Sequence, residues 1–189
     1  MNAATFVSRS LVDPAGVARG LMGLHLSRGT LWSLLALVTV VSTLLVQAGL
    51  VLIPGNSGAA TFTPFTLTLI LGSSLVVMIF AIQLTGQVFG GTGRIDQAIL
   101  LVSWWQGIGL VIQAVQLVAA LVLAPLAGIV TLLGLGWLVF ALLHFVNVLH
   151  GFNSLFKALG CVAVGILGFS FGIAIFLTLL GVSVQGGPA

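Results

Sequence analysis

Side chains capable of acid–base chemistry are scarce in this chain. Its 189 residues include only two carboxylates, Asp13 and Asp96, and no tyrosine. Both aspartates lie near arginines in polar segments, where a helix cap or a surface ion pair is the expected role. Catalysis by paired carboxylates and metal binding by carboxylates each need several such groups at one site. The sequence therefore excludes both kinds of chemistry.

Three histidines and one cysteine are the remaining candidates for metal or nucleophilic chemistry. His25, His144 and His150 could share a metal only if the N-terminal segment folded beneath the helix expected at 126–149. With no acidic or cysteine partner to complete and orient such a site, we expect none. Cys161 stands alone in an apolar run, so no intrachain disulfide can form. We expect no metal, no cofactor and no enzymatic activity.

One glycine-rich stretch, Phe89-Gly90-Gly91-Thr92-Gly93-Arg94, has some likeness to a phosphate-binding loop. It lacks the lysine and hydroxyl residue that end a P-loop, and Asp96 stands where a dinucleotide turn has its third glycine. We therefore interpret this stretch as a turn between two helices.

Amides and imidazoles within the long apolar stretches form a recurring polar pattern. At about 100° per residue, Gln106, Gln113 and Gln116 fall on one arc of a helix. Unpaired amides in hydrocarbon cost several kcal/mol, so these faces must point into a bundle or a water-filled cavity. We predict one polar intramembrane cluster from three helices: Gln83, Gln87, Gln106, Gln113, Gln116, His144 and Asn147.

This cluster has two interpretations. It can supply hydrogen bonds between helices, each worth about 0.6 kcal/mol, or it can line a path for a small solute. A proton- or ion-coupled transporter ordinarily carries carboxylates or arginines within the membrane. Because none occurs here, we favour the hydrogen-bonding interpretation and keep the solute path as the alternative.

Small residues recur along the last apolar stretch. Cys161, Gly165, Gly168 and Gly172 are spaced as on one helix face. Small residues allow helix backbones to approach closely in lipid. We predict that Gly165, Gly168 and Gly172 pack against a neighbouring helix within the bundle, with a dimer contact as the alternative.

Composition identifies the elements that position these residues. Hydrophobic residues make up 60% of the chain, charged residues 4%, and the mean hydropathy is +1.34. Seven charged groups cannot cover a water-soluble fold, so lipid must solvate the surface. We predict an all-α, polytopic membrane bundle. The charged segments at Arg94–Asp96 and Lys157 separate three apolar stretches, and turns at Pro54–Gly58 and Pro125 divide the first two. This gives five transmembrane helices, at 30–53, 65–89, 98–123, 126–149 and 156–181.

The few basic residues indicate an orientation. With five spans, Arg9, Arg19, Arg28, Arg94 and Lys157 all fall on one side. The positive-inside rule makes that side the cytoplasm, with the C-terminus outside. We expect a multi-pass protein of the cell inner membrane. Despite a pI near 10.7, the basic residues form no patch, so we expect no nucleic-acid partner.

Residues 1–29 form the expected cytoplasmic N-terminal segment, ahead of a transmembrane domain at 30–181 and a tail at 182–189. Asp13-Pro14 is typical of a helix start. Val17, Leu21 and Leu24 then share a face opposite Arg19, which predicts a short amphipathic helix lying on the inner leaflet. The alternative is a frayed tail, because three glycines weaken this helix: Gly16, Gly20 and Gly23.

The layout resembles bacterial members of the Yip1 family. The similarity spans about Leu11 to Leu180 and includes Asp13-Pro14, the 89–94 stretch after the second helix, and His150-Gly151-Phe152 after the fourth. The resemblance implies a five-helix bundle without known enzymatic activity and supplies no catalytic residue. Eukaryotic relatives act in vesicle trafficking and contact small GTPases through a longer N-terminal region, which is not carried over here.

Two functional classes follow. The first is a non-enzymatic structural or accessory protein that associates with other membrane protein subunits, or with a second copy of itself, or organises the bilayer. The second is a small-solute permease or channel that uses the Gln/His/Asn cluster. Glycine-rich helix faces and the lack of ionisable groups favour the first.

Overall fold

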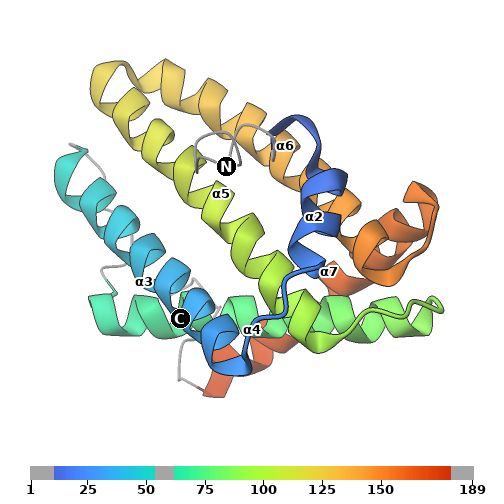
Figure 1. Cartoon of the computed structure of the whole chain (residues 1–189). Coiled ribbons are helices and arrows are strands. Elements are labelled where there is room, and N and C mark those ends of the chain that lie inside the picture. The colour runs from blue at the N-terminus through green and yellow to red at the C-terminus, as the bar shows by residue number, and fades with distance from the viewer. Residues whose placement is uncertain (1–10, 54–61, 180–189) are drawn as a thin grey trace.

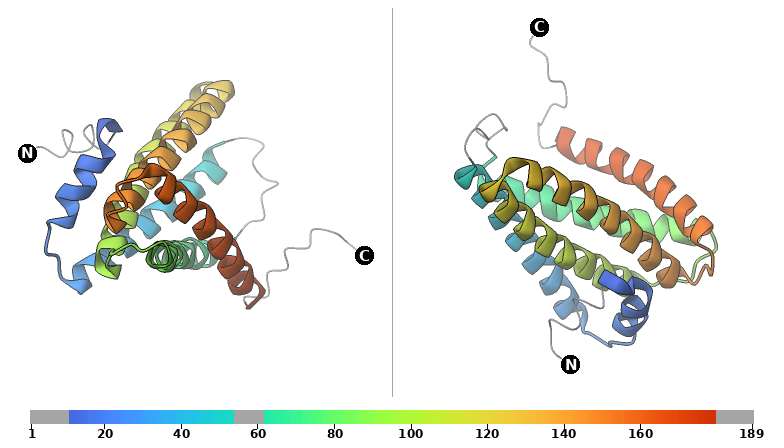
Figure 2. Two further views of the ribbon diagram at one scale, coloured as in Figure 1. Left: turned by 90° about the vertical axis from the view of Figure 1, so that its right-hand side faces the viewer. Right: turned by 90° about the horizontal axis from the view of Figure 1, so that it is seen from above.

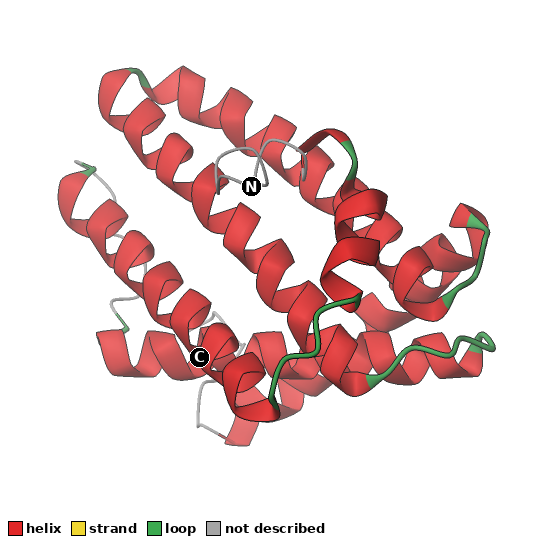
Figure 3. Cartoon of the chain, viewed as in Figure 1, coloured by secondary structure: helices red, strands yellow, loops and turns green. Residues whose placement is uncertain are grey.

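A computed structural model describes residues 11–53 and 62–179. This part of the chain is helical apart from short connections and holds no strand (Figure 3). It contains six helices: α2 (Pro14–Met22), α3 (Arg28–Leu52), α4 (Pro64–Val88), α5 (Ile95–Val122), α6 (Ala124–His150) and α7 (Leu155–Leu179). Five of them, α3 to α7, are long and apolar enough to cross a membrane. The chain is therefore a multi-pass helical membrane protein.

The five predicted spans are confirmed, with boundaries within three residues of those expected. Local chemistry explains several of these boundaries. The Ser27 hydroxyl accepts the Thr30 N–H at the start of α3, and Thr63 does the same for Thr66 at the start of α4. The turn expected at Pro125 is a single residue, Leu123, between α5 and α6. The turn at Pro54–Gly58 and the tail at 182–189 lie outside the described residues.

The long helices form two layers. Helices α3, α5 and α6 lie side by side, while α4 and α7 pack together and cross them (Figure 1). Arg28, Arg94 and Lys157 all lie where α3, α5 and α7 begin and where α4 and α6 end. We call this the charged end of the bundle. The opposite end, which holds the α5–α6 turn, is the uncharged end.

Tight packing is concentrated near the charged end. The largest fully buried side chains include Ile79 on α4, Leu101 on α5, Val146 on α6 and Cys161 on α7. Each lies in the half of its helix, or near its middle, toward that end. Large side chains nearer the uncharged end, such as Leu132, are exposed. The bundle is closed at the charged end and more open at the other.

Helix α2 packs against α5 and α6. Asp13 caps it as expected, since its carboxylate accepts the Gly16 N–H at 2.8 Å. Val17 and Leu21 are buried against α5 and α6, whereas Arg19 is exposed. Of the expected apolar face, Val17 and Leu21 are buried, whereas Leu24 lies past the end of α2 and is 52% exposed. The contact of this helix with the inner leaflet stays a prediction. The neighbouring helices already offer an apolar surface for it to cover.

Candidate functional site

Two sequence-distant motifs meet at the charged end. The Thr92 N–H, in the glycine-rich loop after α4, donates to the His150 carbonyl at 3.3 Å. The His150 side chain is only 2% exposed, and its ring stacks on Phe152 with centroids 5.3 Å apart. The 89–94 stretch and the His150-Gly151-Phe152 turn therefore form one structural unit, which we call the histidine junction.

Three glycines make room for the His150 side chain. A Cβ atom at Gly86 would fall on the ring atoms Nε2, Cε1 and Cδ2 of His150. At Gly91 it would lie 2.5 Å from the His150 Cβ, and at Gly93 it would lie 2.8 Å from the ring. Any larger residue at these positions must displace the imidazole. The junction holds α4, the 89–94 loop and α6 together by close packing.

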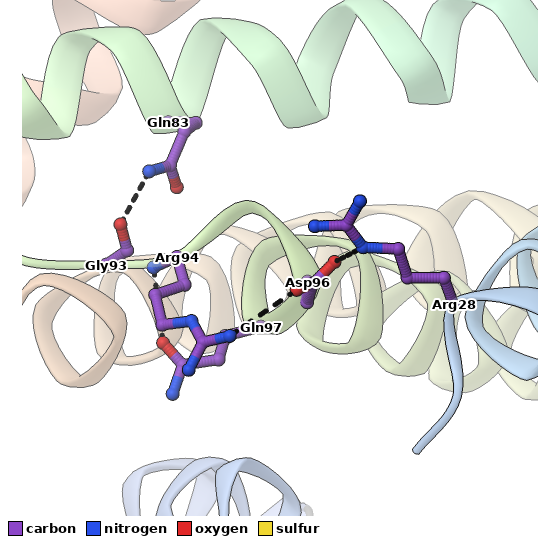
Figure 4. Close-up of polar contacts among 6 residues, drawn as sticks. All are labelled: Arg28, Gln83, Gly93, Arg94, Asp96 and Gln97. Carbon is purple, nitrogen blue, oxygen red and sulfur yellow. Dashed lines mark hydrogen bonds and ion pairs between the residues drawn. The ribbon is translucent and has the colours of Figure 1, made fainter. Parts of the chain in front are cut away.

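Hydrogen bonding at the histidine junction is incomplete. The Gln83 side-chain amide donates to the Gly93 carbonyl at 2.5 Å, which ties α4 to the loop (Figure 4). Neither ring nitrogen of His150 has a hydrogen-bond partner among the described residues, and nor does the Gln83 Oε1 atom. The backbone of Ile82 lies beside the ring without the geometry of a hydrogen bond.

The carboxylate near the histidine junction, Asp96, forms ion pairs with two arginines. Asp96 binds Arg28 at 3.2 Å and Arg94 at 3.6 Å, so it joins the starts of α3 and α5 (Figure 4). The Arg94 N–H donates to the Gln97 side chain, which caps α5. His150 therefore lacks a carboxylate to orient it for acid–base chemistry, and packing is the role its surroundings support.

The seven residues of the predicted polar cluster do not bond to one another. Near the charged end, Gln83 binds the Gly93 backbone and Gln87 is exposed. His144 bonds to the Phe140 carbonyl of its own helix at 2.9 Å. The side-chain Oδ1 atom of Asn147 accepts the Ser154 N–H at 3.2 Å and so holds the α6–α7 turn.

The α5 glutamines pair with short hydroxyl side chains instead. Gln106 donates to Ser42 on α3 at 2.8 Å, and Gln116 donates to Thr131 on α6 at 2.7 Å. The Gln113 Oε1 atom is buried without a partner among the described residues. Gln106 and Gln116 thus make hydrogen bonds between helices, as the favoured interpretation expected, but their partners are not the other residues of the predicted cluster. Helix α5 lies between α3 and α6, so it meets their hydroxyls rather than the amides near the charged end.

The predicted small-residue face of α7 contacts α4 at two of its three glycines. A Cβ at Gly165 would lie 3.5 Å from the Thr85 hydroxyl, and one at Gly172 would lie 2.8 Å from Val77, both on α4. At Gly168 no atom from another helix within 11–53 and 62–179 lies within 4 Å of the Cβ position, so its predicted packing is wrong. The α4 side chains reach α7 at Thr85 and Val77, and Gly168 lies at the edge of this stripe.

A ligand-sized cavity lies between the two layers. It has a volume of about 520 Å³ and is lined by residues of α3 to α7, among them Ser42, Met78, Trp105, Leu138 and Phe169. It exists because the layers diverge from the charged end. We call it the wedge cavity. Of the seven predicted cluster residues, Gln106 alone is among the residues that line it.

Sequence reasoning missed both the histidine junction and the wedge cavity. The glycines at 86, 90, 91 and 93 were a possible signal, because they leave space that a nearby large side chain can fill. The cavity has no comparable signal, since it depends on the angle between layers. No group of three or more histidines, cysteines or aspartates within 11–53 and 62–179 could hold a metal ion.

No family model, curated protein or solved structure matches this chain.

Proposed function

We propose that this chain is a non-enzymatic accessory protein of the cell inner membrane that associates with another membrane protein. Its N-terminus lies in the cytoplasm and its C-terminus outside, with the charged end of the bundle on the cytoplasmic side. The placement of Arg28, Arg94 and Lys157 at one end supports this orientation. The resemblance to the Yip1 family remains part of the proposal.

The main support for the proposal is that the five spans are buried to different extents within the bundle. Within its most apolar window, α6 has 11% of its residues buried, compared with 44% for α5. At Gly128, near the uncharged end, and at Gly136, near the middle of α6, no atom of a neighbouring described residue lies within 4 Å of a Cβ position. Bare backbone on the exposed face of a helix allows the close approach through which transmembrane helices associate. The partner is a transmembrane helix, from another subunit or from a second copy.

A permease has less support from the same geometry. The residues proposed to line a solute path bond to hydroxyls and backbone groups on different helices. The wedge cavity has mainly apolar walls and does not include Gln113 among its lining residues. A polar solute would find few partners there.

Photocrosslinking in the membranes of cells that produce this protein tests whether α6 associates with another transmembrane helix. A photoreactive residue replaces Leu132 on α6, which is 73% exposed, or Leu44 on α3, which is 62% exposed. We expect a discrete protein adduct from position 132 and a much weaker one from position 44. An adduct of twice the chain's mass would identify the partner as a second copy. Lipid adducts alone from both positions would contradict the proposal.

A further inference from the structure

The wedge cavity has the dimensions of a binding site. Its volume of about 520 Å³ falls within the range of roughly 300–1,000 Å³ that is typical of small-molecule pockets. Residues from both layers contribute to its walls, with α4 and α7 on one side and α3, α5 and α6 on the other. A void of this size in a folded protein is filled by whatever medium reaches it.

The chemistry of the walls disfavours water as the occupant. Most lining residues are aliphatic or aromatic, and the polar ones other than Ser170 have partners within the protein. The Trp105 indole donates to the Leu138 carbonyl at 2.9 Å, and Ser74 donates to the Ile70 carbonyl at 2.7 Å. Gln106 donates to Ser42. A buried water needs two to four polar partners, and these groups offer few.

The cavity opens between α6 and α7. These two helices diverge from their shared turn (Figure 2, left). Leu135 and Val139 on α6 and Ile166 on α7 line the cavity and are also exposed at the protein surface. The mouth is thus continuous with the apolar outer surface of two membrane spans, where hydrocarbon is the surrounding medium.

We propose that the acyl chain of a membrane lipid occupies the wedge cavity, entering between α6 and α7. Hydrocarbon in contact with the mouth fills the space, because an acyl chain gains dispersion contacts with Met78, Leu138 and Phe169 that an empty cavity would forfeit. The bundle therefore carries an intramembrane lipid site. Its mouth borders the α6 surface proposed for a protein partner, because Leu135 and Val139 lie three and seven residues after Leu132, on the same helix face.

Tryptophan quenching by lipids with brominated acyl chains tests the site. Trp105 lines the cavity, so a variant with Trp32, Trp104 and Trp137 replaced by phenylalanine reports on its contents. After reconstitution into phosphatidylcholine vesicles, brominated chains should quench Trp105 strongly, and acrylamide added to the aqueous phase should not. Weak quenching by the brominated chains, or strong quenching by acrylamide, would overturn the proposal.

A matched serine pair assigns the quenching to the cavity. Ser73 and Ser74 are neighbours on α4, and both hydroxyls bond to carbonyls of their own helix. Only Ser74 is among the residues that line the cavity. Ser74→Phe should fill part of the space and reduce the quenching, while Ser73→Phe should leave it unchanged. Equal quenching in both variants would contradict an occupant inside the wedge. If Ser74→Phe fails to fold, the quenching of Trp105 by brominated chains and by acrylamide in the single-tryptophan protein still tests whether an acyl chain occupies the cavity.

Discussion

Gly86→Ala is expected to destabilise the bundle by about 1–3 kcal/mol, the usual cost of overpacking a close-packed core. The added methyl group would occupy the position of the His150 ring, which is enclosed on its other sides by Gly91 and Gly93. The imidazole must therefore move, and the contact between α4 and α6 at the charged end loosens. Reversible unfolding in detergent micelles measures the change in free energy.

Removing His150 should relieve this cost. In a His150→Ala background the space is vacant, so Gly86→Ala should cost much less than in the parent, and the two effects should not add. Gly107→Ala is the matched control. Gly107 is also inside a long helix, but nothing lies within 4 Å of its Cβ position. Additive losses for Gly86→Ala and His150→Ala would show that the ring does not occupy the glycine-lined space.

Gly172→Leu is expected to destabilise the contact between α4 and α7 by a similar amount, about 1–3 kcal/mol. Even the first side-chain carbon would lie 2.8 Å from the Val77 methyl group, so a leucine must push the two helices apart. The free energy of unfolding in the same micelles measures this loss.

Gly168→Leu provides the comparison within one helix. The two glycines are one turn apart on α7, but Gly168 has open space around it. Its substitution should leave the free energy of unfolding close to that of the parent. Equal losses at both positions would mean that Gly168 faces a helix, as its spacing had suggested, and that α7 packs differently from the arrangement described above.

The spans could be predicted because their signals are local. Charges at Arg28, Arg94 and Lys157 mark three helix starts, and Pro125 marks the turn between two others. The cap at Asp13 is likewise a matter of neighbouring residues. These features depend on solvation and backbone chemistry within a few positions, so a single sequence contains them.

Contacts between helices could not be predicted in the same way. Gln106 was expected in one polar cluster with residues of two other helices, but the order of helices in the layer brings it to Ser42. The burial of His150 depends on a loop and a turn that meet only after folding. The wedge cavity depends on the angle between two layers. Periodicity tells which residues share a face, whereas the neighbour of that face is decided by the whole bundle.

Both proposals rest on the placement of these helices across a bilayer, and cysteine accessibility tests that placement most directly. In a Cys161→Ser background, single cysteines replace Thr92 at the charged end, Leu132 within α6, and Leu123 at the α5–α6 turn. With a membrane-impermeant thiol reagent, Thr92→Cys should react only from the cytoplasmic side, Leu123→Cys only from outside, and Leu132→Cys from neither. Reaction of positions 92 and 123 from the same side would contradict the membrane-spanning bundle.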